Sequence, residues 1–192
     1  MENSLLAKRL DEHIAVARLL GGDRRIAGQV NEVAKRIVEC YRNGGKTIFF
    51  GNGGSAADAQ HAAAEFMGKY LKDRKSLPSI ALTTNTSTLT AIGNDYGYDE
   101  VFRRQLEGLL KKGDIVIGIS TSGNSPNVVN AIEYARDNGG FTVALVGAKK
   151  CKLDEIADIC IKIPSESTPR IQEMHEFLLH TICEIVEKEL FP

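Results

Sequence analysis

The chain has 192 residues, enough for one domain with a sizeable hydrophobic core. Hydrophobic residues make up 43% and charged residues 26%, the balance of an ordinary globular protein. The formal net charge of −1 offers no basic surface, so nucleic acid and acidic membranes are not expected as partners. No apolar run reaches the roughly 18 residues of a membrane span, and we expect no secretory leader.

Each cysteine of the chain lies in or beside an apolar segment, and no two have C-x-x-C spacing. Disulfides are rare in reducing compartments, so we expect reduced, buried thiols in a cytoplasmic protein. The four residues are Cys40, Cys151, Cys160 and Cys183.

Residues 1–45 contain two predicted amphipathic helices, at 4–20 and 25–42, each followed by a glycine pair. One small sheet cannot bury both helices. We therefore expect this segment to serve oligomerisation as part of the same domain, with the first helix packed against another subunit.

Residues 46–192 alternate between predicted strands and predicted helices, which is typical of a parallel sheet covered on both faces. The continuous apolar character of the strands favours burial on both sides. The predicted fold class is α/β, a single domain with a five-stranded parallel sheet flanked by helices on both faces. The strands are expected at 46–50, 79–83, 115–119, 141–146 and 159–163, and the helices at 55–70, 86–93, 98–110, 126–138, 152–157 and 170–190.

The segment Gly51–Ser55 follows the first predicted strand and opens a helix. Its glycines allow close approach of the backbone to a ligand, and the N–H groups of a helix N-terminus attract phosphate. Ser55 is the expected N-cap, with a hydroxyl that can also reach the phosphate. The alternative is an ordinary strand–helix turn, which is common.

Asp58, His61 and Glu65 share one face of the helix at 55–70. The helix is rich in alanine and apolar nearly all round, as a packed helix would be. Ionisable groups on such a helix need partners or a function, so they are candidates for acid–base chemistry or metal binding. The alternative is an ordinary surface pair of His61 and Glu65.

The segment Ser120–Pro126 (STSGNSP) places hydroxyl groups directly after the strand at 115–119. Open α/β sheets bind ligands at this end of their strands. Pro126 suits the first position of a helix, which makes Ser125 the expected N-cap. The segment matches neither the Walker nor the dinucleotide-binding glycine pattern. It predicts a phosphate site without a lysine, with a locally capped turn as the alternative.

The helix at 170–190 has polar residues beside its apolar stripe: Gln172, His175, Glu176 and His180. Spacing alone does not choose between His175 and His180 as the functional histidine. A histidine framed by leucines is also common as an ordinary core residue.

Taken together, these segments resemble the sugar isomerase (SIS) family, and more closely the bacterial phosphoheptose isomerases. The serine loop alone would indicate a phosphosugar-binding SIS domain, whereas Glu65 and His180 together point to the isomerases. The resemblance is carried by Gly51–Ala56, Asp58–His61 with Glu65, Gly93–Asp95, Ser120–Ser125, and Arg170–Glu173 with His175 and His180.

The resemblance implies interconversion of sedoheptulose 7-phosphate and D-glycero-D-manno-heptose 7-phosphate through a cis-enediol, for bacterial heptose and surface polysaccharide. It implies a cytoplasmic homotetramer with active sites between subunits and one Zn²⁺ per subunit. Glu65 and His180 would be catalytic. The implied metal ligands are His61, Glu65, Gln172 and His180. The implied substrate-binding residues are Asn52, Gly53, Gly54, Ser55, Glu65, Asn94, Asp95, Ser120, Thr121, Ser122, Ser125 and Gln172.

Two alternatives stay open at this point. The first is a non-catalytic SIS protein that binds a phosphosugar or the bacterial replication initiator. Such proteins tend to lack the acid and the histidine at the positions of Glu65 and His180. The second is an isomerase of another phosphosugar, because a phosphate loop recognises the end of a sugar chain rather than its length.

Overall fold

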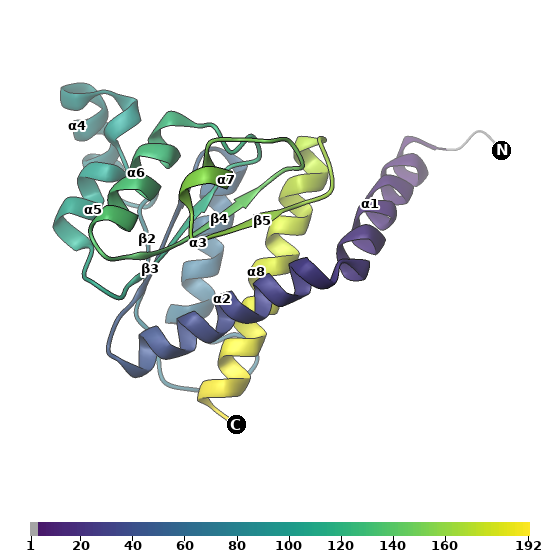
Figure 1. Cartoon of the computed structure of the whole chain (residues 1–192), viewed down its shortest axis with the longest axis horizontal. Coiled ribbons are helices and arrows are strands. Elements are labelled where there is room, and N and C mark those ends of the chain that lie inside the picture. Colours follow the sequence, from purple (N-terminus) through teal and green to yellow (C-terminus); the bar gives the residue numbers. More distant parts are fainter. Residues whose placement is uncertain (1–3) are drawn as a thin grey trace.

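The computed structural model describes residues 4–192 of the chain. Within them, five parallel strands form one sheet in the order β2-β1-β3-β4-β5 (Figure 1). This confirms the predicted α/β fold with a five-stranded parallel sheet. The strands are β1 (Thr47–Gly51), β2 (Ser79–Ala81), β3 (Ile115–Ile119), β4 (Phe141–Val146) and β5 (Ile159–Lys162).

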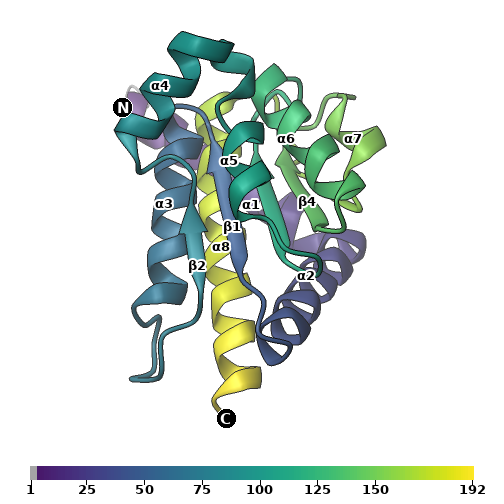
Figure 2. The same cartoon turned by 90° about the vertical axis from the view of Figure 1, so that its left-hand side faces the viewer.

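Helices cover both faces of the sheet, as expected from the apolar strands. Alternate side chains of a strand enter two separate cores: Phe49 lies in one, and Ile48 and Phe50 lie in the other. The first core is covered by α2 (Arg24–Arg42), α3 (Gly54–Met67) and α8 (Thr168–Leu190). The second is covered by α5 (Arg103–Leu109), α6 (Pro126–Asp137) and α7 (Leu153–Ile156), with α4 (Thr86–Tyr96) further out (Figure 2).

Several element boundaries differ from the sequence expectations. The predicted helix 98–110 is divided into the 3₁₀ turn η1 (Tyr98–Glu100) and α5, because Val101 and Phe102 turn into the core between them and are 0% and 1% exposed. The predicted strand 79–83 ends at Ala81. Helix α8 begins at Thr168, two residues before its expected start, with a proline in its first turn.

The N-terminal helix α1 (Leu5–Gly22) extends away from the sheet, whereas α2 crosses α8 and packs against it (Figure 1). Val16 and Leu20 of α1 are buried, but Leu6 and Leu19 are 77% and 60% exposed. The oligomerisation role of residues 1–45 stays a prediction, and residues 1–3 of that segment lie outside the described residues.

The cysteines behave as the sequence indicates. Cys40, Cys151 and Cys183 are buried and Cys160 is partly buried, and all four are free thiols. From residue 4 onward, no helix has both the length and the apolar character that crossing a bilayer requires.

The strand order places a topological switch point between β1 and β3. The connection from β1 leads outward to β2, while the chain from β3 continues in the opposite direction through β4 to β5. Open α/β sheets bind ligands in the crevice at the carboxyl ends of two such strands. The segments that leave β1 and β3 here are the glycine-rich turn and the serine loop.

Candidate active site

The glycine-rich turn after β1 starts α3 one residue earlier than expected. The N-cap is Gly53, with φ +57°, and the helix begins at Gly54. The prediction of Ser55 as N-cap was therefore wrong, because Gly53 adopts the left-handed conformation that lets the helix begin before Ser55. Ser55 lies in the first helical turn and is 3% exposed.

Two contacts tie this turn to other elements. The side-chain amides of Asn52 and Asn127 form a reciprocal pair, with both N···O distances at 2.9 Å, so the turn is fixed to α6. On the other side, a Cβ atom at Gly54 would lie 2.3 Å from Nε2 of Gln172. Gln172 of α8 thus packs directly against the N-terminus of α3, and a Cβ at position 54 would require its side-chain amide to move.

The serine loop after β3 gathers its hydroxyl groups. Ser120 Oγ lies 3.1 Å from Ser125 Oγ and 3.4 Å from Ser122 Oγ, and it accepts a hydrogen bond of 3.2 Å from the N–H of Gly123. Gly123 has φ +64°, and a Cβ there would lie 2.2 Å from Cys151 Sγ. Ser125 holds the expected N-cap position of α6, but its hydroxyl faces Ser120 instead of capping the helix.

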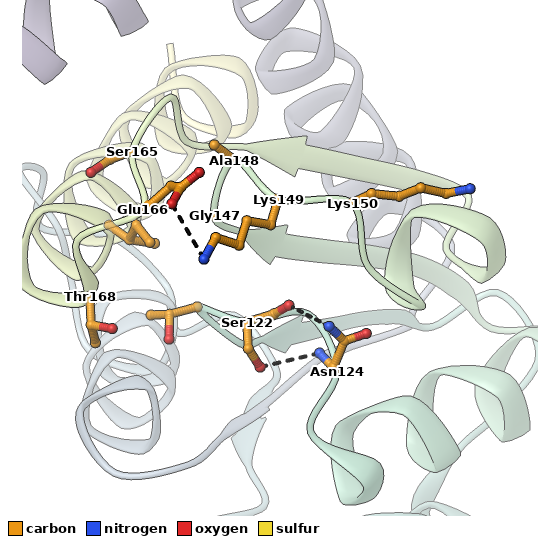
Figure 3. A pocket seen from close by; sticks show the side chains of 11 residues that line it. Ser122, Asn124, Gly147, Ala148, Lys149, Lys150, Ser165, Glu166 and Thr168 are labelled. Atoms are coloured by element: carbon orange, nitrogen blue, oxygen red, sulfur yellow. Dashed lines mark hydrogen bonds and ion pairs between the residues drawn. The ribbon is translucent and has the colours of Figure 1, made fainter.

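A pocket of about 230 Å³ opens beside this loop (Figure 3). Loops after β3, β4 and β5 line it, together with the first turn of α8. Lys149 pairs with Glu166 across it at 3.3 Å. Hydroxyl groups, helix N–H groups and an ammonium are suited to binding phosphate. The lining residues are Thr121, Ser122, Asn124, Gly147, Ala148, Lys149, Lys150, Ser165, Glu166, Thr168 and Ile171.

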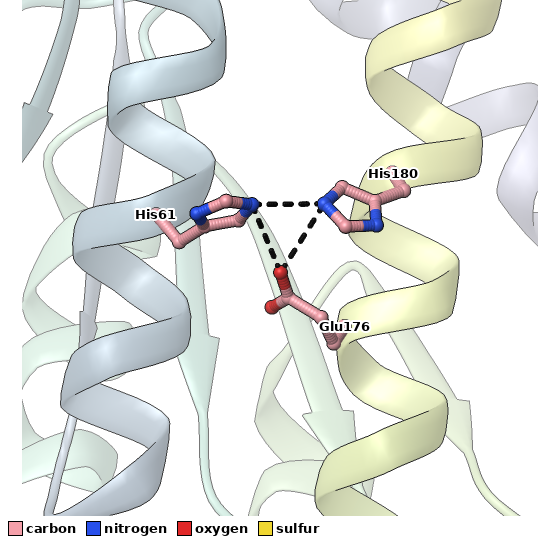
Figure 4. Close-up of side chains that lie close together, drawn as sticks. All are labelled: His61, Glu176 and His180. Atoms are coloured by element: carbon pink, nitrogen blue, oxygen red, sulfur yellow. Dashed lines mark hydrogen bonds and ion pairs between the residues drawn. The ribbon is translucent and has the colours of Figure 1, made fainter.

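A second polar group lies between α3 and α8. His61 Nε2 is 2.8 Å from His180 Nε2, and Glu176 Oε1 lies 3.1 Å from His61 Nε2 and 3.2 Å from His180 Nε2 (Figure 4). Glu65 Oε1 reaches the same nitrogen of His61 at 3.3 Å. Glu65 and His180 therefore meet at His61, although they are far apart in the sequence. The ring of Tyr70 lies against His180, with centroids 5.7 Å apart.

The two candidate histidines of α8 have different environments. His175 is fully buried, and burial lowers its pKa to about 4, against a weaker opposing effect of its hydrogen bond to the Val146 carbonyl. That bond measures 3.4 Å from Nε2. His180 faces α3 with its side chain 37% exposed. Geometry thus answers what spacing left open: His180 is the histidine that lies beside His61.

Two carboxyl groups near the histidines, those of Asp58 and Glu176, are partly buried. Burial raises the pKa of Asp58 to about 6, and the charge of Glu176 adds to this shift. Asp58 Oδ2 and Glu176 Oε2 are both buried without a hydrogen-bond partner. One carboxyl oxygen on each of the two facing helices therefore lacks a compensating donor or cation.

The group of His61, Glu176 and His180 fits a divalent cation. Its three ligand atoms all lie within 4.8 Å of one another, a set that does not include Glu65. Tetrahedral zinc with bonds of about 2.0 Å keeps its ligand atoms about 3.3 Å apart. The observed distances of 2.8, 3.1 and 3.2 Å are close to that spacing.

Asn94 and Asp95 lie apart from these contacts. Both are exposed at the end of α4, where Asn94 Nδ2 donates to Asp95 Oδ1 at 2.8 Å. Helix α4 follows β2, so these residues lie toward the carboxyl edge of the sheet. Contacts within this chain do not join them to the histidines.

Sequence reasoning noted Glu176 but assigned it no role. A usable signal was present, because Glu176 and His180 have the same i, i+4 spacing as His61 and Glu65. It also assigned no role to Asn127, in the first turn of α6, or to Lys149 and Lys150, whose positions depend on how the loop after β4 folds.

A doubly wound α/β domain with a glycine-rich turn and a serine loop at its switch point has the features of a phosphosugar-binding domain. The model of the SIS domain family matches residues 15–147. Similar proteins include a phosphoheptose isomerase of Sulfurimonas denitrificans, 52% identical over 97% of this chain and 95% of its own, and one of Aliarcobacter butzleri, 50% identical over 99% of both. The structure of phosphoheptose isomerase from Neisseria gonorrhoeae superposes with a TM-score of 0.90 at 38% identity, covering 98% of this chain and 100% of that one. The chain belongs to the phosphoheptose isomerases of the SIS domain family.

Proposed function

We propose that this chain is an aldose–ketose isomerase that converts sedoheptulose 7-phosphate to D-glycero-D-manno-heptose 7-phosphate in the cytoplasm, for bacterial heptose and surface polysaccharide. The observation that carries the proposal is helix α8. Its first turn lines the anion pocket through Thr168 and Ile171, and its later turns bring Glu176 and His180 to His61. One rigid helix thus connects a phosphate site with acid–base groups.

The phosphate end of the substrate is held by hydroxyl and backbone N–H groups in this proposal. Charge-assisted hydrogen bonds to a dianion are stronger than those between neutral groups. Holding the phosphate fixes the distance from the reacting carbons to the base, which is the main contribution of binding to the rate. The phosphate-binding hydroxyls are those of Ser55, Ser120, Thr121, Ser122 and Ser125, and the sugar chain is lined by Asn52, Gly53, Gly54, Asn94 and Asp95.

Glu65 and His180 are the proposed acid–base pair. The Glu65 carboxylate removes the proton from the carbon next to the carbonyl and returns it to the neighbouring carbon. His180 transfers the second proton between the two oxygens, and the intermediate is a cis-enediol. His61 contacts both groups, which supports their action on one substrate.

We further propose that the site binds one Zn²⁺ per subunit. The two histidines hold the cation, and Glu65 and Gln172 are the additional ligands implied by the resemblance. When bound, the cation acts as a Lewis acid that polarises the carbonyl oxygen. A carboxylate on a cation is a weaker base, so Glu65 has two conflicting tasks in this arrangement.

A homotetramer is proposed as the working assembly, with α1 in the contact between subunits. The support is the apolar surface that α1 presents outward, including Leu5, Leu6, Leu10 and Leu19, which are 54–77% exposed. Sedimentation at micromolar concentration tests this proposal, and a monomeric mass would contradict it.

The function is tested by incubating the purified protein with sedoheptulose 7-phosphate and following the aldose by chromatography, with a hexulose phosphate in parallel. We expect turnover of the heptulose phosphate. Preferred turnover of the hexulose phosphate would assign another phosphosugar. Binding of both sugars without turnover would leave a phosphosugar-binding protein.

A further inference from the structure

Helices α3 and α8 each carry a histidine and a glutamate at i, i+4 spacing: His61 with Glu65, and Glu176 with His180. The two glutamates differ in how many of the histidines they contact. Glu176 Oε1 lies within 3.2 Å of both imidazoles, whereas the ion pair of Glu65 is with His61 alone. Figure 4 shows the carboxylate of Glu176 directed between the two rings.

The contacts of Glu176 leave its charge poorly compensated. Its ion pairs are with the two histidines, which carry charge only when protonated. The other carboxylate oxygen, Oε2, is buried without a hydrogen-bond partner. The neighbouring carboxyl of Asp58 adds a second buried oxygen without a partner. A carboxylate in such surroundings requires a cation or a proton.

We propose that Glu176 is a ligand of the divalent cation that binds between His61 and His180, in addition to the ligands named above. This inference rests on the proposed function only in that a cation binds there. The distances between the three ligand atoms are already close to those between three ligand atoms of a tetrahedral zinc site. Because Glu176 supplies a carboxylate ligand, the cation stays bound when Glu65 leaves it, and Glu65 is then available as the carbon base.

The test measures metal affinity rather than activity. Zn²⁺ is titrated against a chromophoric chelator in the wild type and in Glu176→Ala, Glu65→Ala and Glu184→Ala. Loss of even an outer-sphere partner weakens metal binding about 10- to 100-fold. We expect Glu176→Ala to weaken Zn²⁺ binding at least about 10-fold. Glu184→Ala is the matched control, because Glu184 is on the same helix and pairs with exposed Lys188, and its affinity should equal that of the wild type.

Unchanged Zn²⁺ affinity in Glu176→Ala would overturn the inference, as would weaker binding in Glu65→Ala alone. The variant Glu176→Gln, which keeps the size and one oxygen, guards against misfolding, and we expect an affinity between those of Glu176→Ala and the wild type. The visible spectrum of bound Co²⁺ gives a second readout, and it should differ between the wild type and Glu176→Ala because the ligand set changes.

The outcomes separate this inference from the proposed function. If the wild type binds no Zn²⁺ but isomerises sedoheptulose 7-phosphate, the inference fails and the isomerase stands. If the wild type binds Zn²⁺ without turnover, the isomerase proposal fails, and the affinity of Glu176→Ala still decides the role of Glu176.

Discussion

The serine loop and the histidine–glutamate group are built in different ways. The serine loop of the pocket is one continuous segment, in which Ser120, Ser122 and Ser125 contact one another within a single turn of chain. The second group joins α3 to α8, and its closest contact spans 119 positions in the sequence. Local sequence therefore determines the shape of the serine loop, whereas helix packing determines the second group. Changes in the pocket should act on substrate binding, and changes in the group between the helices should act on turnover or on stability.

The largest expected effect follows from Glu65→Gln. A single general base typically contributes 10²–10⁴ to the rate, so we expect kcat to fall by roughly 10² or more. The circular dichroism spectrum should not change, because glutamine keeps the size of the side chain. Steady-state kinetics with sedoheptulose 7-phosphate measure the effect. Near-normal turnover would remove Glu65 from the chemistry.

Next in size is the effect of Glu187→Gln on stability. The Glu187 carboxylate accepts hydrogen bonds from the N–H groups of Tyr70, Leu71 and Lys72 and pairs with Arg74 at 2.9 Å, both side chains of the pair being buried. Removing one partner of a buried pair costs about 3–5 kcal/mol. Urea unfolding should show a loss of this size.

The matched control is Glu184→Gln, whose partner Lys188 is exposed and whose unfolding free energy should change by less than about 1 kcal/mol. Equal stability of the two variants would contradict the structural role of Glu187. Because Tyr70 lies against His180, Glu187→Gln should also loosen the segment that covers this histidine.

A smaller effect is expected from the buried His175 of α8, on the pH dependence of stability. The pKa of His175 is lowered by burial to about 4, so the folded protein favours the neutral imidazole. The unfolded chain, with a pKa of about 6.5, binds the proton first, so stability is complete above that pH and is lost as the pH falls toward 4. Between pH 7.5 and 5 this amounts to roughly 2 kcal/mol from His175.

Urea unfolding at both pH values measures this loss. In His175→Gln the free energy of unfolding should depend less on pH than in the wild type. His13→Gln is the control, since His13 is partly exposed on α1 and should keep the wild-type loss. The same loss in His175→Gln as in the wild type would contradict the burial argument.

Most of the fold could be predicted from the sequence, because strands with continuous apolar runs and helices with apolar stripes are local signals. The serine loop could be predicted for the same reason: β3, the hydroxyls and Pro126 are consecutive. The start of α3 was misplaced, because serine is a preferred N-cap residue and Ser55 was expected there, whereas Gly53 takes the cap position with a positive φ.

The choice between His175 and His180 could not be made from the sequence. At about 100° per residue, the two side chains are about 140° apart around the helix. Apolar neighbours flank both, so the pattern does not say which side packs on the sheet and which on α3. The same limit hid the position of Glu176, whose contact with His61 exists only because α3 and α8 pack side by side (Figure 4).

The smallest effects are expected in the pocket. Ser122 lines it, whereas Ser120 is 5% exposed and holds the loop through Gly123. A hydrogen bond to a charged group contributes about 1.5–3 kcal/mol, so Ser122→Ala should raise KM by roughly 10-fold or more. Because the phosphate does not react, kcat should change much less than KM. Ser122→Ala therefore differs from Glu65→Gln, in which kcat falls.

Ser120→Ala should raise KM as well and lower the stability by about 1 kcal/mol, because the N–H of Gly123 then loses its side-chain acceptor. Ser76→Ala, in an exposed loop away from the pocket, is the control and should leave both constants unchanged. If Ser122→Ala lowered kcat and left KM unchanged, the pocket would not be a separate phosphate site. Binding and chemistry would then depend on one connected group of residues, and the distinction between the local site and the packed site would fail.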